Sequence, residues 1–185
     1  PIIQKAFTRI FDYKQNLFIM EVNFLILALA AFVPLFIGFI WYGPFLFQNT
    51  WIKLSGHSKE SLKSTNVVLI YILLYLFSFS LAFFLQFIVI HQTGVYSSLL
   101  ESGANELTGD RLTYFDDFMA KYGSNYRSFK HGVLHGVLVA LFLILPILAT
   151  QAMLEKKSIK YLAINAGYWI ISIALMGGVV CKWGF

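Results

Sequence analysis

The sequence predicts an all-α, polytopic membrane protein: a four-helix transmembrane bundle with a short amphipathic helix in the long connection between spans two and three. The composition is the first observation behind this prediction. Hydrophobic residues make up 58% of the 185 residues and charged residues 12%, whereas a soluble domain is about one quarter charged. The mean hydropathy is +0.71. A chain this short cannot hide so much apolar side chain inside one globule, so lipid must solvate it.

Four apolar segments are the second observation. Each is long enough to cross a hydrocarbon core, which takes about 20 residues, and none has a charged side chain at mid-depth. Because lipid offers no partner to backbone N–H and C=O groups, each crossing segment must be helical. The predicted spans cover residues 22–42, 67–90, 129–152 and 159–181.

The first nineteen residues differ from the spans, because they mix Lys5, Arg9 and Lys14 with apolar side chains. Two interpretations stay open for residues 1–19. They form an amphipathic helix in the membrane interface, or they are a non-native upstream extension and Met20 is the natural start. We interpret residues 20–185 as a single four-span membrane domain.

The connection over residues 92–128 is the long one. Within it, an apolar stripe at helical spacing predicts the short amphipathic helix, with Asp110 as N-cap and Gly123 as the stop. We expect this helix to pack on the bundle or to lie in the headgroup region; a lid over a site is the alternative. The stripe consists of Leu112, Phe115, Met119 and Tyr122.

Small residues recur along the third and fourth spans. Such stripes let helix backbones approach closely in lipid, where packing drives helix association. We therefore expect the closest helix contact between spans three and four. The third-span stripe is Gly132, Gly136 and Ala140, within "KHGVLHGVLVA", and the fourth-span stripe is Ala163, Gly167, Ala174 and Gly178.

Three histidines are the candidate metal ligands. His131 and His135 are four residues apart, the spacing that a metal-binding pair on one helix face uses. His91 ends the second span, so the topology brings it to the same membrane face. No acidic residue adjoins the pair and no H-E-x-x-H motif is present. A structural or proton-responsive cluster is therefore our first interpretation, and a bound metal ion or haem is the alternative.

Two intramembrane polar residues, Gln86 and Asn165, are further candidates, because polar side chains inside a bilayer are costly and often functional. For Asn165 we expect a hydrogen bond to a neighbouring helix rather than a ligand contact. The single Cys181 excludes an intrachain disulfide and cannot form a zinc site alone.

Several stretches carry a resemblance to a known family. They are "PLFIGFIWYGPFLF" (residues 34–47), "WIKLSG" (51–56), "LILPILATQAMLEKKSIKYLAINAGYW" (143–169) and "ALMGGVV" (174–180). Together they resemble the bacterial membrane-protein family known as domain of unknown function seventeen sixty-one. The resemblance implies a multi-pass protein of the bacterial cytoplasmic (inner) membrane. It transfers no functional residue.

No Walker loop, dinucleotide fingerprint or nucleophile elbow occurs in the sequence, which favours a protein that is not an enzyme. No catalytic residue and no cofactor is expected. The first functional prediction is a binding or accessory protein for a small hydrophobic or lipid-like molecule, or for a membrane partner. The alternatives are a small oligomeric transporter or channel, and a histidine-ligated metal or haem protein. The partners expected are the bilayer and a second copy or another membrane protein; the scattered basic residues exclude nucleic acid.

Overall fold

The computed structural model describes residues 22–57 and 66–185, so the interpretations of residues 1–19 fall outside the described residues. The described chain divides into two compact units. One, which we call the spanning unit, consists of Asn23–Ile90 and Arg127–Phe185; the other, the long-connection unit, is built on His91–Tyr126. Each unit is described by itself.

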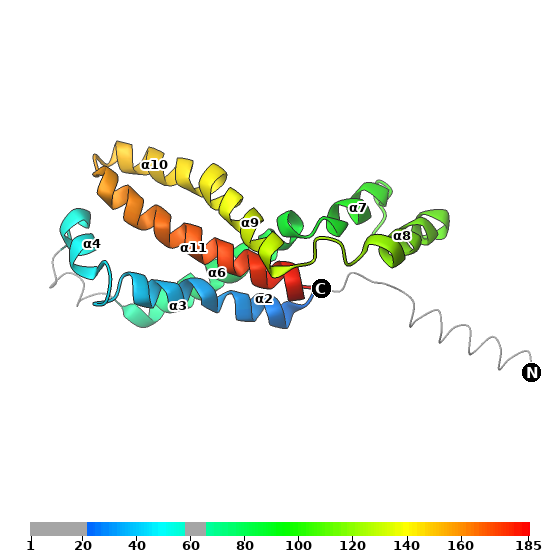
Figure 1. The fold of residues 1–185 in the computed structure, drawn as a ribbon, viewed down its shortest axis with the longest axis horizontal. Helices are drawn as coiled ribbons and strands as arrows, with labels where there is room; N and C mark the ends of the chain where they lie inside the picture. Colours follow the sequence, from blue (N-terminus) through cyan, green and yellow to red (C-terminus); the bar gives the residue numbers. More distant parts are fainter. Residues whose placement is uncertain (1–21, 58–65) are drawn as a thin grey trace, which may run out of the picture. The chain divides into compact units, whose positions relative to one another are not determined.

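The spanning unit confirms the prediction of four membrane-spanning helices, since all four are long and apolar enough to cross a bilayer. The observed bounds agree with the predicted ones to within two residues. The first span is α2 (Phe24–Ala30) with α3 (Phe32–Trp41), the second α6 (Val67–Val89), the third α9 (Phe129–Val139), η1 (Ala140–Ile144) and α10 (Leu145–Leu154), and the fourth α11 (Ile159–Trp183) (Figure 1).

Each span begins at a polar capping residue, which explains where the helices start. The first backbone N–H groups of a helix lack partners within the helix, and an Asn or Ser side chain at the N-cap accepts a hydrogen bond from one of them. In all four spans the cap accepts from the N–H three residues further on. The caps are Asn23, Asn66, Ser128 and Ser158.

Two prolines interrupt the first and third spans. Proline has no N–H and its ring clashes with the preceding turn, so a regular helix cannot run through it. The first span breaks at Ala31, three residues before Pro34. In the third span the π-helical turn η1 ends two residues before Pro146. The Tyr168 hydroxyl of α11 donates a hydrogen bond to the Pro34 carbonyl (3.1 Å), which attaches the interrupted first span to the fourth.

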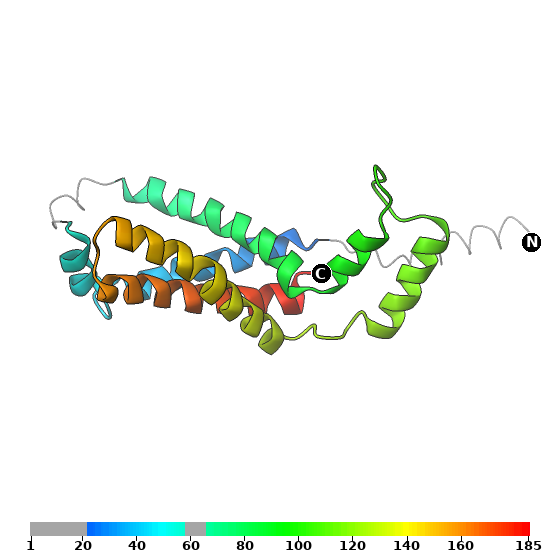
Figure 2. The same ribbon diagram turned by 90° about the horizontal axis from the view of Figure 1, so that it is seen from above.

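The fourth span, α11, lies at the centre of the spanning unit. It contacts all three other spans, and the third span runs antiparallel beside it (Figures 1 and 2). In its most apolar stretch 61% of the residues are buried, against 11–22% in the other spans, and its hydropathy is the lowest of the four, 1.7 against 2.5–2.6. A helix that faces protein on most sides has less need of lipid-soluble side chains.

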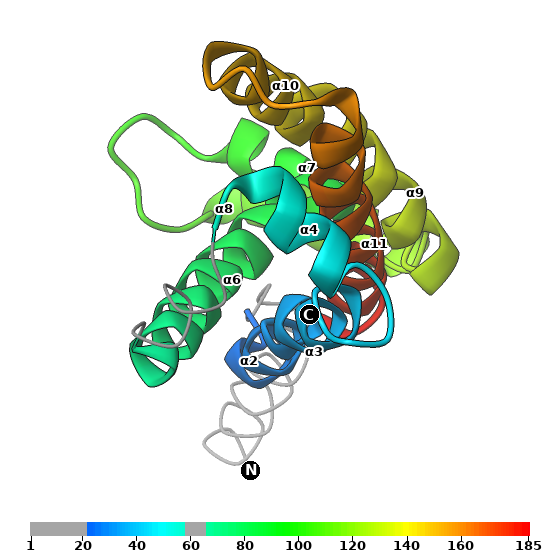
Figure 3. The same ribbon diagram turned by 90° about the vertical axis from the view of Figure 1, so that its left-hand side faces the viewer.

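The second span contacts the others through only part of its length. No residue of α6 before Ser78 is buried, whereas Ala82, Leu85 and Val89 are fully buried toward its C-terminal end. Figure 3, which looks along the bundle, shows the beginning of α6 separated from the other spans. The first half of α6 therefore presents apolar side chains to the bilayer.

The long-connection unit contains α7 (Gln92–Leu99) and α8 (Gly109–Tyr122). The predicted amphipathic helix is thus confirmed as α8, with two details corrected. Thr108 occupies the N-cap position and Asp110 lies in the first turn. Tyr122 is 49% exposed, so the buried face of α8 is formed by Phe115 and Met119.

Neither α7 nor α4 (Gln48–Ser55), in the connection after the first span, was predicted. The partners of α8 in its own unit are the apolar side chains of α7, Val95, Tyr96 and Leu99. Both unpredicted helices have eight residues and take their stability from such packing, because a helix this short is marginal alone.

Candidate metal centre

The contact between α9 and α11 fixes the backbone on which two of the three candidate histidines lie. A Cβ atom added to Gly132 would collide with the carbonyl oxygen of Gly177, and one added to Gly136 would collide with that of Ile173. The two backbones therefore touch directly at both glycines. This is the most extensive contact between helices in the described chain.

The small-residue stripe of the fourth span is divided between two partners. Gly178 packs against the Phe129 ring of α9, but Gly167 lies against the Trp41 ring of α3, and Ala163 is exposed. Gly177 faces Gly132 and was not among the predicted contacts. In the sequence, the adjacent glycines Gly177 and Gly178 could have indicated this contact. The remaining small residues of the two stripes, Ala140 and Ala174, are buried.

His131 and His135 lie one turn apart near the start of α9. Their ring centroids are 4.5 Å apart and the ring planes are inclined by 63°. Both side chains are half-buried. The Ser128 hydroxyl accepts a hydrogen bond from the His131 N–H (3.2 Å), which fixes the start of the helix that carries them.

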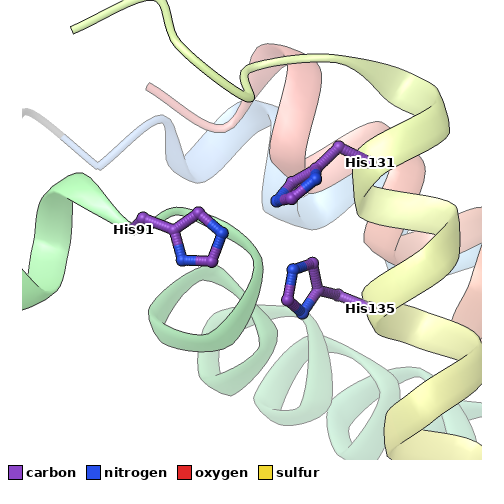
Figure 4. A group of neighbouring side chains, drawn as sticks. All are labelled: His91, His131 and His135. Carbon is purple, nitrogen blue, oxygen red and sulfur yellow. The ribbon is translucent and has the colours of Figure 1, made fainter. Parts of the chain in front are cut away.

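His91 is the first residue of the long-connection unit, after the end of the second span. It directly follows Ile90, whose N–H closes the last turn of α6 on the Gln86 carbonyl (3.0 Å), so α6 sets the position of its backbone. Figure 4 labels the three candidate ligands: His131 and His135 on α9, and His91 directly after α6. His91 is exposed, and its ring also contacts that of Tyr126 edge-on at 5.9 Å.

Cys181 is not one of these candidate ligands. Its thiol is buried and donates a hydrogen bond to the Val89 carbonyl (3.3 Å). That bond connects the end of α11 to the end of α6.

Gln86 is fully buried in the last turns of α6 (0% exposed), and neither atom of its side-chain amide has a hydrogen-bond partner among the described residues. A buried amide without a partner costs about 1–3 kcal/mol. Native proteins contain few buried polar groups without a partner, so each one calls for an explanation. Within the described spans, Gln86 has two such atoms, and the hydroxyl of the fully buried Ser172 is the other side-chain atom of this kind.

Replacing Gln86 with methionine is expected to raise the stability of the bundle by about 1–3 kcal/mol, because an apolar side chain of similar length removes the unpaired amide. Thermal unfolding in detergent measures this. The control is Gln151→Met, which removes an exposed amide bonded to Glu155 (2.9 Å) and should change little. A less stable Gln86→Met variant would show that the amide is paired in the native protein.

Asn165 connects α11 to the turn after the first span. The Tyr42 hydroxyl donates a hydrogen bond to the Asn165 side-chain oxygen (2.9 Å), and the Asn165 amide donates to the Tyr161 carbonyl (2.7 Å). The neighbouring Trp41 indole donates to the Ile164 carbonyl (2.9 Å). These bonds attach the "WYGP" turn to the fourth span, and they occupy both ends of the Asn165 side chain.

Gln92 is a structural residue that the sequence did not reveal. It is buried at the start of α7, and its amide nitrogen lies 3.0–3.2 Å from the carbonyl oxygens of Tyr122, Gly123 and Asn125. These carbonyls belong to the last residue of α8 and to two residues after it, where the helix itself supplies no donors. Gln92 thus caps α8 from the neighbouring helix. About thirty residues separate it from its partners in the sequence, so no local pattern predicts this contact.

An apolar groove lies between α3 and the first half of α6. Its volume is about 420 Å³, and apolar or aromatic side chains form its walls. The Phe32 and Tyr75 rings meet at one end, 4.7 Å apart, and the Tyr75 hydroxyl donates to the Ala28 carbonyl (3.3 Å). The remaining lining residues are Leu35, Val67, Val68, Tyr71, Ile72 and Leu76.

Comparison with known proteins gives one match. A family model described as "Protein of unknown function (DUF1761)" matches residues 25–181. No curated protein and no solved structure matches the chain.

Proposed function

Because the chain belongs to the family described as "Protein of unknown function (DUF1761)", we propose from its geometry that this membrane protein is a non-enzymatic binder of a lipid-like molecule. The groove between α3 and α6 is the observation that supports this proposal. Its volume falls in the range of small-molecule sites, and such sites are concave and mainly apolar. The bacterial inner membrane is the location we propose, from the resemblance given above.

The groove suits one hydrocarbon chain rather than a polar substrate. It lies between two transmembrane helices and is formed where α6 stands away from the bundle, so a molecule can enter sideways from the bilayer. The only polar atoms that the lining side chains offer are the hydroxyls of Tyr71 and Tyr75, and Tyr75 already donates to Ala28. An acyl or isoprenoid chain would be bound by apolar contact with the aromatic and branched side chains.

Photo-crosslinking with a diazirine-bearing palmitic acid tests the proposal in isolated membranes. Bulk lipid labels every lipid-facing surface in proportion to its concentration, whereas a site saturates. We expect labelling of residues 67–76 that saturates and is displaced by excess unlabelled fatty acid or phospholipid. The Leu35→Trp and Val68→Trp variants should abolish the saturable fraction, because an indole fills the groove.

The matched control is Leu143→Trp, since Leu143 is 48% exposed on the third span and does not line the groove. It should leave saturable labelling unchanged. Labelling of residues 67–76 that never saturates would contradict the proposal. Native mass spectrometry after mild extraction adds a second readout: a retained lipid supports binding, whereas a lipid-free symmetric oligomer would favour a small transporter or channel instead.

A further inference from the structure

We propose that a small pocket between α10 and α11 binds the headgroup of phosphatidylethanolamine, with the ammonium group of the lipid against Glu155. The pocket lies where α10 ends and α11 begins (Figure 1), and its volume is about 90 Å³. Gln151 lines it from α10, and Tyr161, Asn165 and Trp169 line it from α11. It shares no lining residue with the groove between α3 and α6, so the two sites can bind lipid independently.

Glu155 determines the sign of the charge that the pocket binds. Among the described residues that line the pocket, Glu155 is the one with a charged side chain. The Gln151 amide donates a hydrogen bond to a carboxylate oxygen of Glu155 (2.9 Å), which orients the carboxylate. Within residues 22–57 and 66–185, no lysine or arginine forms an ion pair with Glu155. The pocket therefore favours a positively charged ligand.

Aromatic side chains make an organic ammonium group the favoured cation. Ammonium groups are attracted to the faces of aromatic rings, and Tyr161 and Trp169 both line the pocket. The Lys157 ammonium already lies 5.6 Å from the centroid of the Tyr161 ring while it donates a hydrogen bond to the Ser55 carbonyl (2.7 Å). Lys157 is thus held toward α4, and its contact shows that the Tyr161 ring accepts an ammonium neighbour.

Hydrogen bonding and size select a primary ammonium group on a short stem. An ionised carboxylate only accepts hydrogen bonds, and a primary ammonium group donates three, whereas a quaternary ammonium group donates none. The volume of about 90 Å³ is well below the range of about 300–1,000 Å³ for whole small molecules. The pocket therefore suits the end group of a larger molecule, such as the ethanolammonium group of a phospholipid.

The position of the pocket in the membrane indicates a lipid as the source of that group. The turn between α10 and α11 joins the third and fourth spans, so it lies at the depth of the lipid headgroups. On either side of this turn, Leu154 and Ile159 are 81% and 85% exposed, as expected of side chains in contact with lipid. Lys156, which follows Glu155, and Lys160 in the first turn of α11 are exposed and supply positive charge for the lipid phosphate.

The turn that carries Glu155 is fixed by its own hydrogen bonds. The Lys157 N–H donates to the Ala152 carbonyl (2.8 Å) and the Lys156 N–H donates to the Met153 carbonyl (3.1 Å). With Lys156 in the left-handed conformation (φ 53°), these bonds form the Schellman motif that ends a helix. A fixed turn favours a defined binding geometry at Glu155.

The test uses the full chain, purified in detergent and washed free of lipid. Native mass spectrometry compares phosphatidylethanolamine with phosphatidylcholine and phosphatidylglycerol of the same acyl chains, and we expect the first to bind most tightly. Glu155→Gln removes the charge but keeps an oxygen that can accept from Gln151. It should weaken phosphatidylethanolamine binding by about tenfold or more, the loss typical of a hydrogen bond to a charged group. The matched control is Glu106→Gln, the same change at an exposed carboxylate outside this pocket, which should leave the affinity unchanged.

A second measurement on the unmodified chain uses vesicles of phosphatidylethanolamine and phosphatidylglycerol. A water-soluble carbodiimide joins a carboxyl group to a primary amine in contact with it through an amide bond, and mass spectrometry locates the product. We expect lipid joined to Glu155. Vesicles in which phosphatidylcholine replaces phosphatidylethanolamine should give no such product, because that lipid has no N–H group.

The proposal is overturned if phosphatidylethanolamine binds no more tightly than phosphatidylcholine, or if no lipid is joined to Glu155. Binding that is lost in Leu35→Trp and unchanged in Glu155→Gln would place the lipid in the groove, which would overturn this inference and support the proposed function. Free ethanolamine distinguishes a lipid from a soluble amine. If free ethanolamine binds at Glu155 and phosphatidylethanolamine does not, the proposal is wrong as well.

Discussion

The Gly136→Ala variant is expected to unfold at a lower temperature than the wild-type chain, with a loss of stability of about 1–3 kcal/mol. The added Cβ atom would collide with the carbonyl oxygen of Ile173 and come within 2.7 Å of the Ala174 Cα atom. Both neighbours are backbone atoms of the central helix α11 and cannot rotate away. Relief of the clash requires the two helices to separate, which also loses the contact at Gly132.

Gly38→Ala makes the same chemical change in another transmembrane helix and serves as the control. There the nearest atom to an added Cβ is in the Tyr168 ring, at the ordinary contact distance of 3.4 Å. Alanine is a better helix former than glycine by up to about 1 kcal/mol, so this variant should be as stable as the wild type or more so. Thermal unfolding of both variants in one detergent measures the difference. Equal melting temperatures would show that α9 and α11 are not in backbone contact.

The second large effect is expected at Arg127, just before the third span. Its Nε donates a hydrogen bond to the Cys181 carbonyl (2.8 Å) and its Nη2 donates to the Phe185 carbonyl (3.3 Å). Burial lowers the pKa of the guanidinium, but arginine stays protonated in proteins. A fixed positive charge therefore lies at the C-terminal end of α11, where the helix dipole is negative and the last carbonyls lack donors.

Arg127→Ala should cost about 1.5–3 kcal/mol, the contribution typical of hydrogen bonds to a charged group. Hydrogen exchange followed by mass spectrometry should locate the effect in the last turns of α11. Arg127→Lys should recover only part of the loss, since an ammonium group cannot reproduce the forked geometry. The control is Lys130→Ala, which removes an exposed positive charge three residues away. If Lys130→Ala destabilises the chain as much, net charge rather than the two hydrogen bonds explains the effect.

Much of the fold followed from the sequence alone. The four spans could be located because the hydrocarbon core imposes a length and an apolar composition that local sequence must satisfy. The helix starts also depend on nearby residues alone, because each cap accepts a hydrogen bond from the N–H three residues further on. The caps are Asn23, Asn66, Ser128 and Ser158. The amphipathic helix α8 was visible for the same reason: its apolar side chains recur at helical spacing.

Only part of the candidate site could be predicted from the sequence. The i, i+4 spacing of His131 and His135 is a property of one helix. Because His91 ends the second predicted span and His131 begins the third, the sequence predicted that all three lie at the same membrane face. Local patterns did not reveal Gln92 as the cap of α8, because its partners lie about thirty residues away. Asp110, in turn, looked like a cap by residue type, yet Thr108 takes the position.

The sequence by itself determined which segments cross the membrane, because each span must satisfy its own backbone and the surrounding lipid. Only the tertiary structure decided which helix is central and which small residues meet. Gly167 packs on Trp41 while Gly177 meets Gly132, although both belong to the same glycine-bearing helix. Small residues permit close approach to any neighbour, and the rotation of α11 among three partners selects the one that each residue contacts.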